Sequence, residues 1–216
     1  MDPLRFCLAL LPLGIYLVVL GSLQLARRPI LVSGARDLAA LGLGVSGIIL
    51  IGPIELFLPR AAAATFGIYI WPLVISFYVL TVTLVVLMAR PRLTAYNVSL
   101  DELRPLLGEV ALGLDAEARW AGASLSLPRL GVELHIEEFP AMHNVSLVAA
   151  NDRQRFEGWQ QLDRALRLRM AQLPVARNPR GVLLLAAGLL LFSAAYARVA
   201  FDPIATEQAF KQMIRQ

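Results

Sequence analysis

Four long apolar runs dominate the pattern of hydrophobic and polar positions in this chain, at about residues 4–25, 38–58, 66–89 and 181–200. An α-helix rises 1.5 Å per residue, so about 20 apolar residues cross the roughly 30 Å hydrocarbon core of a bilayer. A core helix of a soluble protein needs only about 10 to 14 such residues. The pattern therefore predicts four transmembrane helices.

A more polar segment, residues 92–180, lies between the third and fourth runs and has the pattern of a folded module. Leu93–Val98 is a predicted strand. Ser99 and Glu102 match a helix capping box, in which each side chain accepts a bond from the other residue's backbone amide. The helix that follows is predicted to end near Gly113.

The second half of this segment has the pattern of further strands and one more helix. Residues 120–127 and 143–149 are predicted strands, and between them Val132–Glu137 alternates strictly between apolar and polar residues. Such alternation predicts a strand with one covered and one wet face. An apolar stripe at spacings of three and four then predicts a helix, through Phe156, Trp159, Leu162, Leu166, Met170 and Leu173.

The predicted fold class is thus a mostly α-helical membrane protein with a small α+β module of order β-α-β-β-β-α inserted between helices 3 and 4. Residues 1–91 carry the first three transmembrane helices, and residues 92–180 form the module. Residues 181–216 carry the fourth helix, at about 181–200, and a short amphipathic tail. Two helices laid on one face of a mostly antiparallel sheet are the economical packing for that order.

Composition supports a membrane location and suggests an orientation. Hydrophobic residues make up 57% of the chain and the mean hydropathy is +0.63. Lys211 is the only lysine among 20 basic residues, a bias typical of a GC-rich bacterial genome. Near the spans, nine basic residues lie on the side of the module and five on the side of the termini. The positive-inside rule then predicts a bacterial inner membrane protein with a cytoplasmic module and both termini in the periplasm.

Small residues in the second span predict a close helix contact. Ala40 and Gly44 are four residues apart and, with Gly47, can line one helix face. Such a face lets another helix approach closely. Packing within the four-helix bundle and contact between copies of the chain are both open as interpretations.

Glu55 is the only acidic residue well inside a predicted span, and a carboxylate there is costly unless it is paired. Arg198 is predicted at a similar depth in the fourth span, so the two can form an intramembrane ion pair. The alternative is that Glu55 reaches Arg60 or water at the interface. Prolines at positions 12, 53 and 72 are predicted to interrupt the first three spans, either around an outward-facing cavity or as ordinary membrane prolines.

The module carries no recognised catalytic, nucleotide-binding or cofactor-binding motif. His135, Glu137 and His143 are the only group that resembles a metal site, and they lack the spacing of a known ligand motif. The alternative is a pair of solvated histidines beside glutamates. We expect no cofactor and no nucleic-acid partner, and no small-molecule substrate is indicated.

Charge is segregated along the module. Residues 92–151 contain four arginines and eight acids, a net charge of −4, whereas residues 152–180 contain seven arginines and three acids, a net charge of +4. The basic half leads back into the membrane, so its arginines are predicted to lie near anionic lipid headgroups. They are Arg167, Arg169, Arg177 and Arg180. The alternative is that the two halves neutralise each other.

Three functional hypotheses fit these observations. The first is a non-catalytic subunit, scaffold or assembly factor of a membrane complex, with a protein partner or a second copy as its ligand. The second is a small transporter or transport accessory that uses Glu55 and the proline-containing half of the bundle. The third is a membrane-bound enzyme or a metal-dependent sensor.

Overall fold

The computed structural model describes residues 3–54, 69–173, 175 and 178–201. Within these residues the chain forms two compact units. The helical unit combines the described parts of 1–21, 38–87 and 183–216, and the sheet module combines those of 22–37 and 88–182. Each unit therefore contains segments that are far apart in the sequence.

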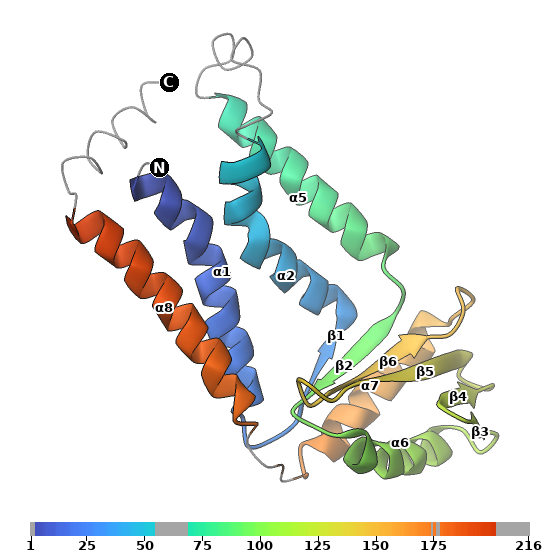
Figure 1. Cartoon of the computed structure of the whole chain (residues 1–216). Coiled ribbons are helices and arrows are strands. Elements are labelled where there is room, and N and C mark those ends of the chain that lie inside the picture. The colour runs from blue at the N-terminus through green and yellow to red at the C-terminus, as the bar shows by residue number, and fades with distance from the viewer. Residues whose placement is uncertain (1–2, 55–68, 174, 176–177, 202–216) are drawn as a thin grey trace. The chain divides into compact units, whose positions relative to one another are not determined.

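The four predicted apolar helices are present among the described residues. They are α1 (Pro3–Gln24), α2 (Gly34–Ile49), α5 (Ile70–Met88) and α8 (Arg180–Phe201) (Figure 1). Each is long and apolar enough to cross a membrane, α2 when it is extended to Gly52 in the turn that follows it. Few of their apolar side chains are buried, and Leu73, Phe77 and Leu87 on α5 are each about two-thirds exposed or more. Exposed apolar surface of this extent is unfavourable in water, so these helix surfaces are suited to contact with lipid.

The prolines act differently from one helix to the next. Pro12 lies within α1, which continues through it, whereas Pro53 lies in the π-helical turn η1 (Leu50–Ile54) that follows α2. Pro72 is the third residue of α5. The N–H groups in the first turn of a helix have no partner within the helix, so a proline there removes no hydrogen bond. Pro72 therefore lies at the start of α5 and does not interrupt it, contrary to the sequence prediction.

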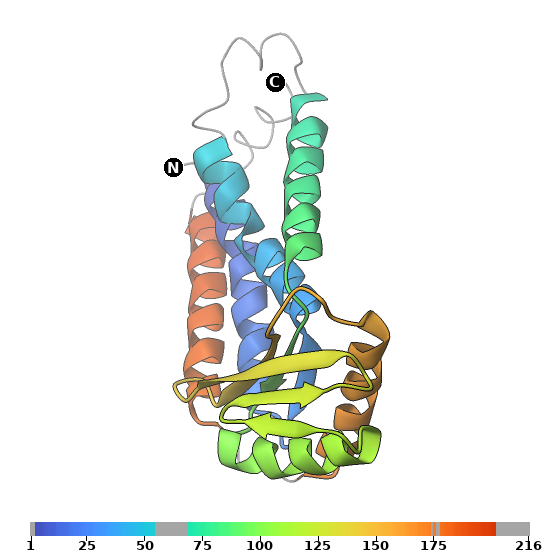
Figure 2. The same cartoon turned by 90° about the vertical axis from the view of Figure 1, so that its right-hand side faces the viewer.

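Six antiparallel strands make the sheet of the module, in the order β1-β2-β6-β5-β4-β3 (Figure 2). The strands are β1 (Ile30–Ser33), β2 (Arg92–Tyr96), β3 (Arg119–Ala121), β4 (Ser124–Leu127), β5 (Val132–Phe139) and β6 (Asn144–Ala149). Val132, Leu134 and Ile136 are buried along β5, while the polar residues between them are exposed. The alternation predicted for this strand is confirmed.

The strand β1 comes from the connection between α1 and α2, which lies outside the module predicted at residues 92–180. It pairs with β2 over four residues, so the module begins well before residue 92. At the end of β1 the chain passes directly into α2 at Gly34, where a Cβ would come within 2.9 Å of the Arg92 Cβ. The predicted order β-α-β-β-β-α was therefore incomplete.

A second correction concerns residues 120–127, which were predicted as one strand. They belong to a hairpin, because Gly122 has a φ of +64° and turns the chain between β3 and β4. Glycine adopts this left-handed conformation without steric cost. The module consequently has four strands after its first helix.

Helices α6 (Leu100–Leu114) and α7 (Phe156–Met170) pack against each other and against one face of the sheet. The Ser99 amide donates to Glu102 Oε2 at 3.0 Å, as the capping box predicted. Four stripe residues of α7 are buried in the common core, namely Trp159, Leu162, Leu166 and Met170. Phe156 is 71% exposed, so the predicted stripe is wrong at its first position.

Candidate binding site

The open edge of the sheet at β3 is the strongest candidate site in the described residues. Strand β3 is last in the sheet order, so its outer backbone edge pairs with no described strand. All three of its residues are exposed. A free strand edge offers unpaired N–H and C=O groups to another chain.

Trp120 lies at the centre of this strand and faces α6. It pairs in register with Leu125, a core residue, so its side chain lies on the helix-covered face of the sheet. Gly108 of α6 lies beside the indole, since a Cβ there would be in ordinary van der Waals contact with Trp120 Nε1, at 4.0 Å. The indole N–H donates to no acceptor among the described residues, and the side chain stays 37% exposed.

Arg104 of α6 holds the tryptophan in place. Its guanidinium carbon lies 5.3 Å from the centre of the Trp120 ring, within the range of a cation–π contact. The same guanidinium donates to the Gly122 carbonyl at 3.1 Å, which ties α6 to the β3–β4 turn. Arginine and tryptophan are thus fixed in a stacked arrangement before any ligand arrives.

A pocket of about 420 Å³ opens beside this pair and is lined by Asp101, Arg104, Pro105 and Trp120. Its volume is at the lower end for ligand pockets, and its lining side chains other than Trp120 belong to a single exposed helix face. Asp101 and Arg104 give it one acidic and one basic group. Such an open site suits one or two side chains of a larger partner better than an enclosed small molecule.

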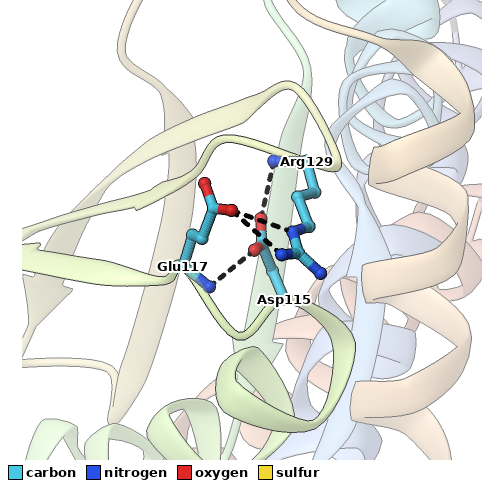
Figure 3. A network of polar contacts seen from close by, with 3 residues as sticks. All are labelled: Asp115, Glu117 and Arg129. Atoms are coloured by element: carbon cyan, nitrogen blue, oxygen red, sulfur yellow. Dashed lines mark hydrogen bonds and ion pairs between the residues drawn. The ribbon is translucent and has the colours of Figure 1, made fainter.

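Asp115, at the C-terminal end of α6, fixes this helix to the sheet (Figure 3). Its carboxylate accepts the Glu117 amide at 2.9 Å and the Arg129 amide at 2.8 Å, which joins the end of α6 to the turn between β4 and β5. Burial acts to raise the pKa of this carboxyl. The backbone amides of Glu117, Arg129 and Leu130, together with the Arg129 guanidinium, outweigh burial and hold the pKa below its ordinary value.

The metal-like residues of the sequence analysis do not converge. His135 and Glu137 lie on the exposed face of β5, and the His135 ring bonds to the Ser124 hydroxyl at 3.2 Å. His135 pairs with Val148, whereas His143 lies in the turn before that strand, so at about 3.3 Å per residue the histidines are roughly 15 Å apart. Within the part of the chain that the structure describes, no three His, Cys, Asp or Glu side chains are grouped to hold a metal ion.

Glu55 lies outside the described residues, so its proposed pairing with Arg198 stays a prediction. Arg198 itself lies in the last turn of α8, with its guanidinium carbon 5.7 Å from the centre of the Phe6 ring of α1. This contact joins the two helices inside the helical unit. It gives the arginine a favourable position with or without a carboxylate nearby.

The small residues of α2 lie against α1 in the helical unit. A Cβ at Gly44 would come within 2.8 Å of the Tyr16 Cβ, and one at Gly47 within 2.6 Å of the Ala9 carbonyl oxygen. Both glycines are buried, whereas Ala40 is exposed. The absence of side chains at Gly44 and Gly47 is therefore accounted for by the approach of α1, and the exposed Ala40 takes no part in that contact.

The arginines predicted to contact lipid headgroups have different environments. Arg167 pairs with Asp163 one turn earlier at 2.9 Å, and Arg169 is exposed on the same helix. Arg180 donates to backbone carbonyls of the turn between β5 and β6. Arg177 lies outside the described residues.

Sequence reasoning missed Asp101, Arg104 and Trp120 as a group. Gly122 was the available signal, because a glycine between two short apolar-polar stretches indicates a hairpin and would have brought β3 to the sheet edge. The contact between Arg104 and Trp120 had no signal, since the two residues lie on separate elements.

Comparison with known proteins adds no relative, because no family model, curated protein or solved structure matches the chain.

Proposed function

We propose that this chain is a multi-pass membrane protein that acts as a subunit, scaffold or assembly factor of a membrane complex. In this proposal the module binds an extended segment of a protein partner at the β3 edge and has no catalytic role. The pairing of an open strand edge with the Arg104–Trp120 pocket is the observation that carries it.

The physical argument combines two sources of binding energy. A peptide that adds to a sheet edge gains main-chain hydrogen bonds, and a neighbouring pocket that takes a side chain adds specificity. Strand β3 has three residues, so the paired stretch spans about 10 Å at the usual strand rise. Tryptophan and arginine are the residues most often responsible for binding energy at protein interfaces.

The proposed location is the inner membrane of a bacterium, with the module in the cytoplasm. The four apolar helices support insertion into a membrane. The orientation is supported by the basic residues near the spans, nine on the side of the module and five on the side of the termini. Pairing of β1 with β2 adds an independent constraint, because it requires both segments to be on the same side of the bilayer. An even number of crossings between them, through α2 and α5, meets that requirement.

Site-specific photocrosslinking in native membranes tests the proposal. A photoreactive phenylalanine analogue replaces Trp120 in the full chain, and the matched control carries it at Phe156, an aromatic position that is also exposed. We expect a discrete protein adduct at position 120 and not at 156. The protein identified in that adduct should co-purify with the wild-type chain and with Phe156→Ala, but not with Trp120→Ala.

Two results would contradict this function. One is an equal pattern of adducts at positions 120 and 156. The other is unchanged co-purification of the identified partner after Trp120→Ala. Either result would remove the β3 edge as the binding surface.

A further inference from the structure

The turn between β5 and β6 exposes apolar side chains although it lies at one end of a well-packed sheet. Phe139 is 51% exposed and Met142 is 39% exposed, and Pro140 and Ala141 between them are also exposed. Along the outer face of β5 the residues change from charged and polar to aromatic on approaching the turn. This end of the strand is therefore apolar where a turn in water is usually polar.

The backbone carbonyls of this turn all accept hydrogen bonds inside the module. Arg180 Nη1 donates to the carbonyls of Pro140, at 3.0 Å, and of Ala141. Asn178 Nδ2 donates to the Met142 carbonyl at 3.2 Å. Phe139 and His143 use their carbonyls for backbone amides, at 3.0 Å and 2.9 Å respectively. A turn with satisfied carbonyls and apolar side chains can leave water at little cost, because unpaired polar groups are what hydrocarbon excludes.

The partners of the turn belong to the ends of two candidate transmembrane helices. Arg180 is the first residue of α8, and Gln24 is the last residue of α1. Gln24 is fully buried, donates to the Met142 sulfur at 3.4 Å and accepts from Asn178 Nδ2 at 2.8 Å. The turn is thus bonded directly to Arg180 and Gln24, the residues at which the two helices meet the module.

We infer that the β5–β6 turn, residues 139–143, is a lipid contact that inserts into the headgroup region of the membrane. Phe139 and Met142 lie at the boundary of the acyl chains, where apolar side chains gain burial. Arg180 supports this contact, because its guanidinium satisfies two of the turn's carbonyls and its charge can stay at the level of the headgroups. The inference rests on the membrane insertion in the proposed function, and it is independent of the β3 edge.

Spin-label accessibility in reconstituted full-length protein tests this contact. In a Cys7→Ser background, single labels are placed through Ala141→Cys at the turn, Ala123→Cys at the β3–β4 turn, and Leu189→Cys on α8. The first two are matched alanine positions in exposed turns, and Leu189 is 61% exposed on a candidate span. The Ala123 carbonyl accepts from the Ile136 amide, so Ala123 lies beside β5, five residues before Ala141 along that strand and turn. Collisions with oxygen, which concentrates in lipid, and with a water-soluble nickel chelate are measured in vesicles of mixed zwitterionic and anionic phospholipid.

We expect the label at Ala141 to favour oxygen and to lose most of the chelate collisions seen at Ala123, with Leu189 the most oxygen-accessible of the three. If Leu189 behaves as expected but Ala141 resembles Ala123, the lipid contact is wrong and membrane insertion stands. Protection of Ala141 from both reagents would mean that protein covers the turn, which also overturns the inference. If Leu189 itself is open to the chelate, membrane insertion fails and the lipid contact fails with it.

Discussion

Asp115 illustrates how much one side chain contributes to the module. Its carboxylate is almost fully buried and binds two backbone amides that are 12 residues apart in the sequence, those of Glu117 and Arg129. Hydrogen bonds to a charged acceptor are shorter and stronger than neutral ones. The neighbouring pair of Arg129 with Glu117, at 3.0 Å, is more than half exposed on both sides and contributes much less.

Replacing Asp115 by Asn is expected to destabilise the module at neutral pH, because an amide cannot accept from both backbone groups with its nitrogen. The pKa of Asp115 is lowered by folding, so its stabilising effect is present above the unfolded pKa of about 3.9 and is lost as pH falls toward the folded pKa. The difference in melting temperature between wild type and Asp115→Asn should therefore be constant from pH 7 to about pH 5 and shrink below about pH 4. Thermal unfolding of the full chain, followed by tryptophan fluorescence, measures it.

Glu117→Gln is the control for this prediction, since it removes only the exposed ion pair. It should change the free energy of unfolding by about 0–1 kcal/mol. If the difference in melting temperature between wild type and Asp115→Asn does not shrink at the lowest pH where both proteins remain folded, the ionised Asp115 carboxylate is not what stabilises the module.

At the scale of elements, close approach between helices depends on glycine. In the helical unit α2 packs on α1 through Gly44 and Gly47, and α1 packs on α8 where a Cβ at Gly188 would come within 2.9 Å of the Gly14 carbonyl oxygen. The Cys7 thiol also donates to the Ala195 carbonyl of α8 at 3.2 Å. In lipid such packing and hydrogen bonding hold helices together, because apolar surface alone gives no preference for protein over acyl chains.

Gly47→Ala should therefore weaken the helical unit, although alanine is otherwise the better helix former. Its Cβ would meet the backbone of α1, which cannot move as a side-chain end can. Overpacking of this kind costs roughly 1–3 kcal/mol. The measurement is the midpoint of thermal unfolding or aggregation of the detergent-solubilised protein.

Gly52→Ala is the matched control, because no atom of the described residues lies within 4 Å of a Cβ at that position. It should leave the midpoint nearly unchanged. If both substitutions lower the midpoint equally, the close approach of α1 to α2 does not explain why position 47 is glycine.

At the scale of the whole molecule, the sheet is assembled from two parts of the chain that the second and third apolar helices separate. Strand β1 precedes α2, and β2 follows α5. The sheet can therefore complete only after both helices are in place, if they cross the membrane as proposed. Pairing across so long a separation in sequence carries a larger loop-closure cost than a hairpin does.

The proposed orientation gives a testable topology. Alkaline phosphatase fused after Gln216 should be active in a bacterial host, because it is active only in the periplasm, and green fluorescent protein at the same place should be dark. The same two reporters inserted in the β3–β4 turn at Gly122 should give the opposite pair of signals. Phosphatase activity at Gly122 together with fluorescence at Gln216 would reverse the proposed orientation. If the same reporter is active at both sites, Gly122 and Gln216 lie on the same side of the membrane, and α8 does not cross it as proposed.

The sequence alone was sufficient for the features that depend on local pattern. The length of an apolar run predicts a membrane-spanning helix without reference to anything else, and four such helices are present. The capping box at Ser99 and the alternation from Val132 to Ile136 also formed as predicted, because each depends on residues within a few positions of one another. Part of the stability of these elements comes from interactions between residues close in sequence, and the sequence pattern predicts those interactions.

Only the tertiary structure decided which segments meet. Residues 30–33 have too short an apolar pattern to predict a strand, and they form one because β2 offers a free edge. Trp120 lies at a pocket because the turn at Gly122 puts β3 at the sheet edge and because Arg104 of α6 contacts its ring. His135 and His143, only eight residues apart in sequence, were separated by the register of β5 with β6. Strand pairing and side-chain contact are non-local, so their energies depend on chain segments that no window of sequence contains.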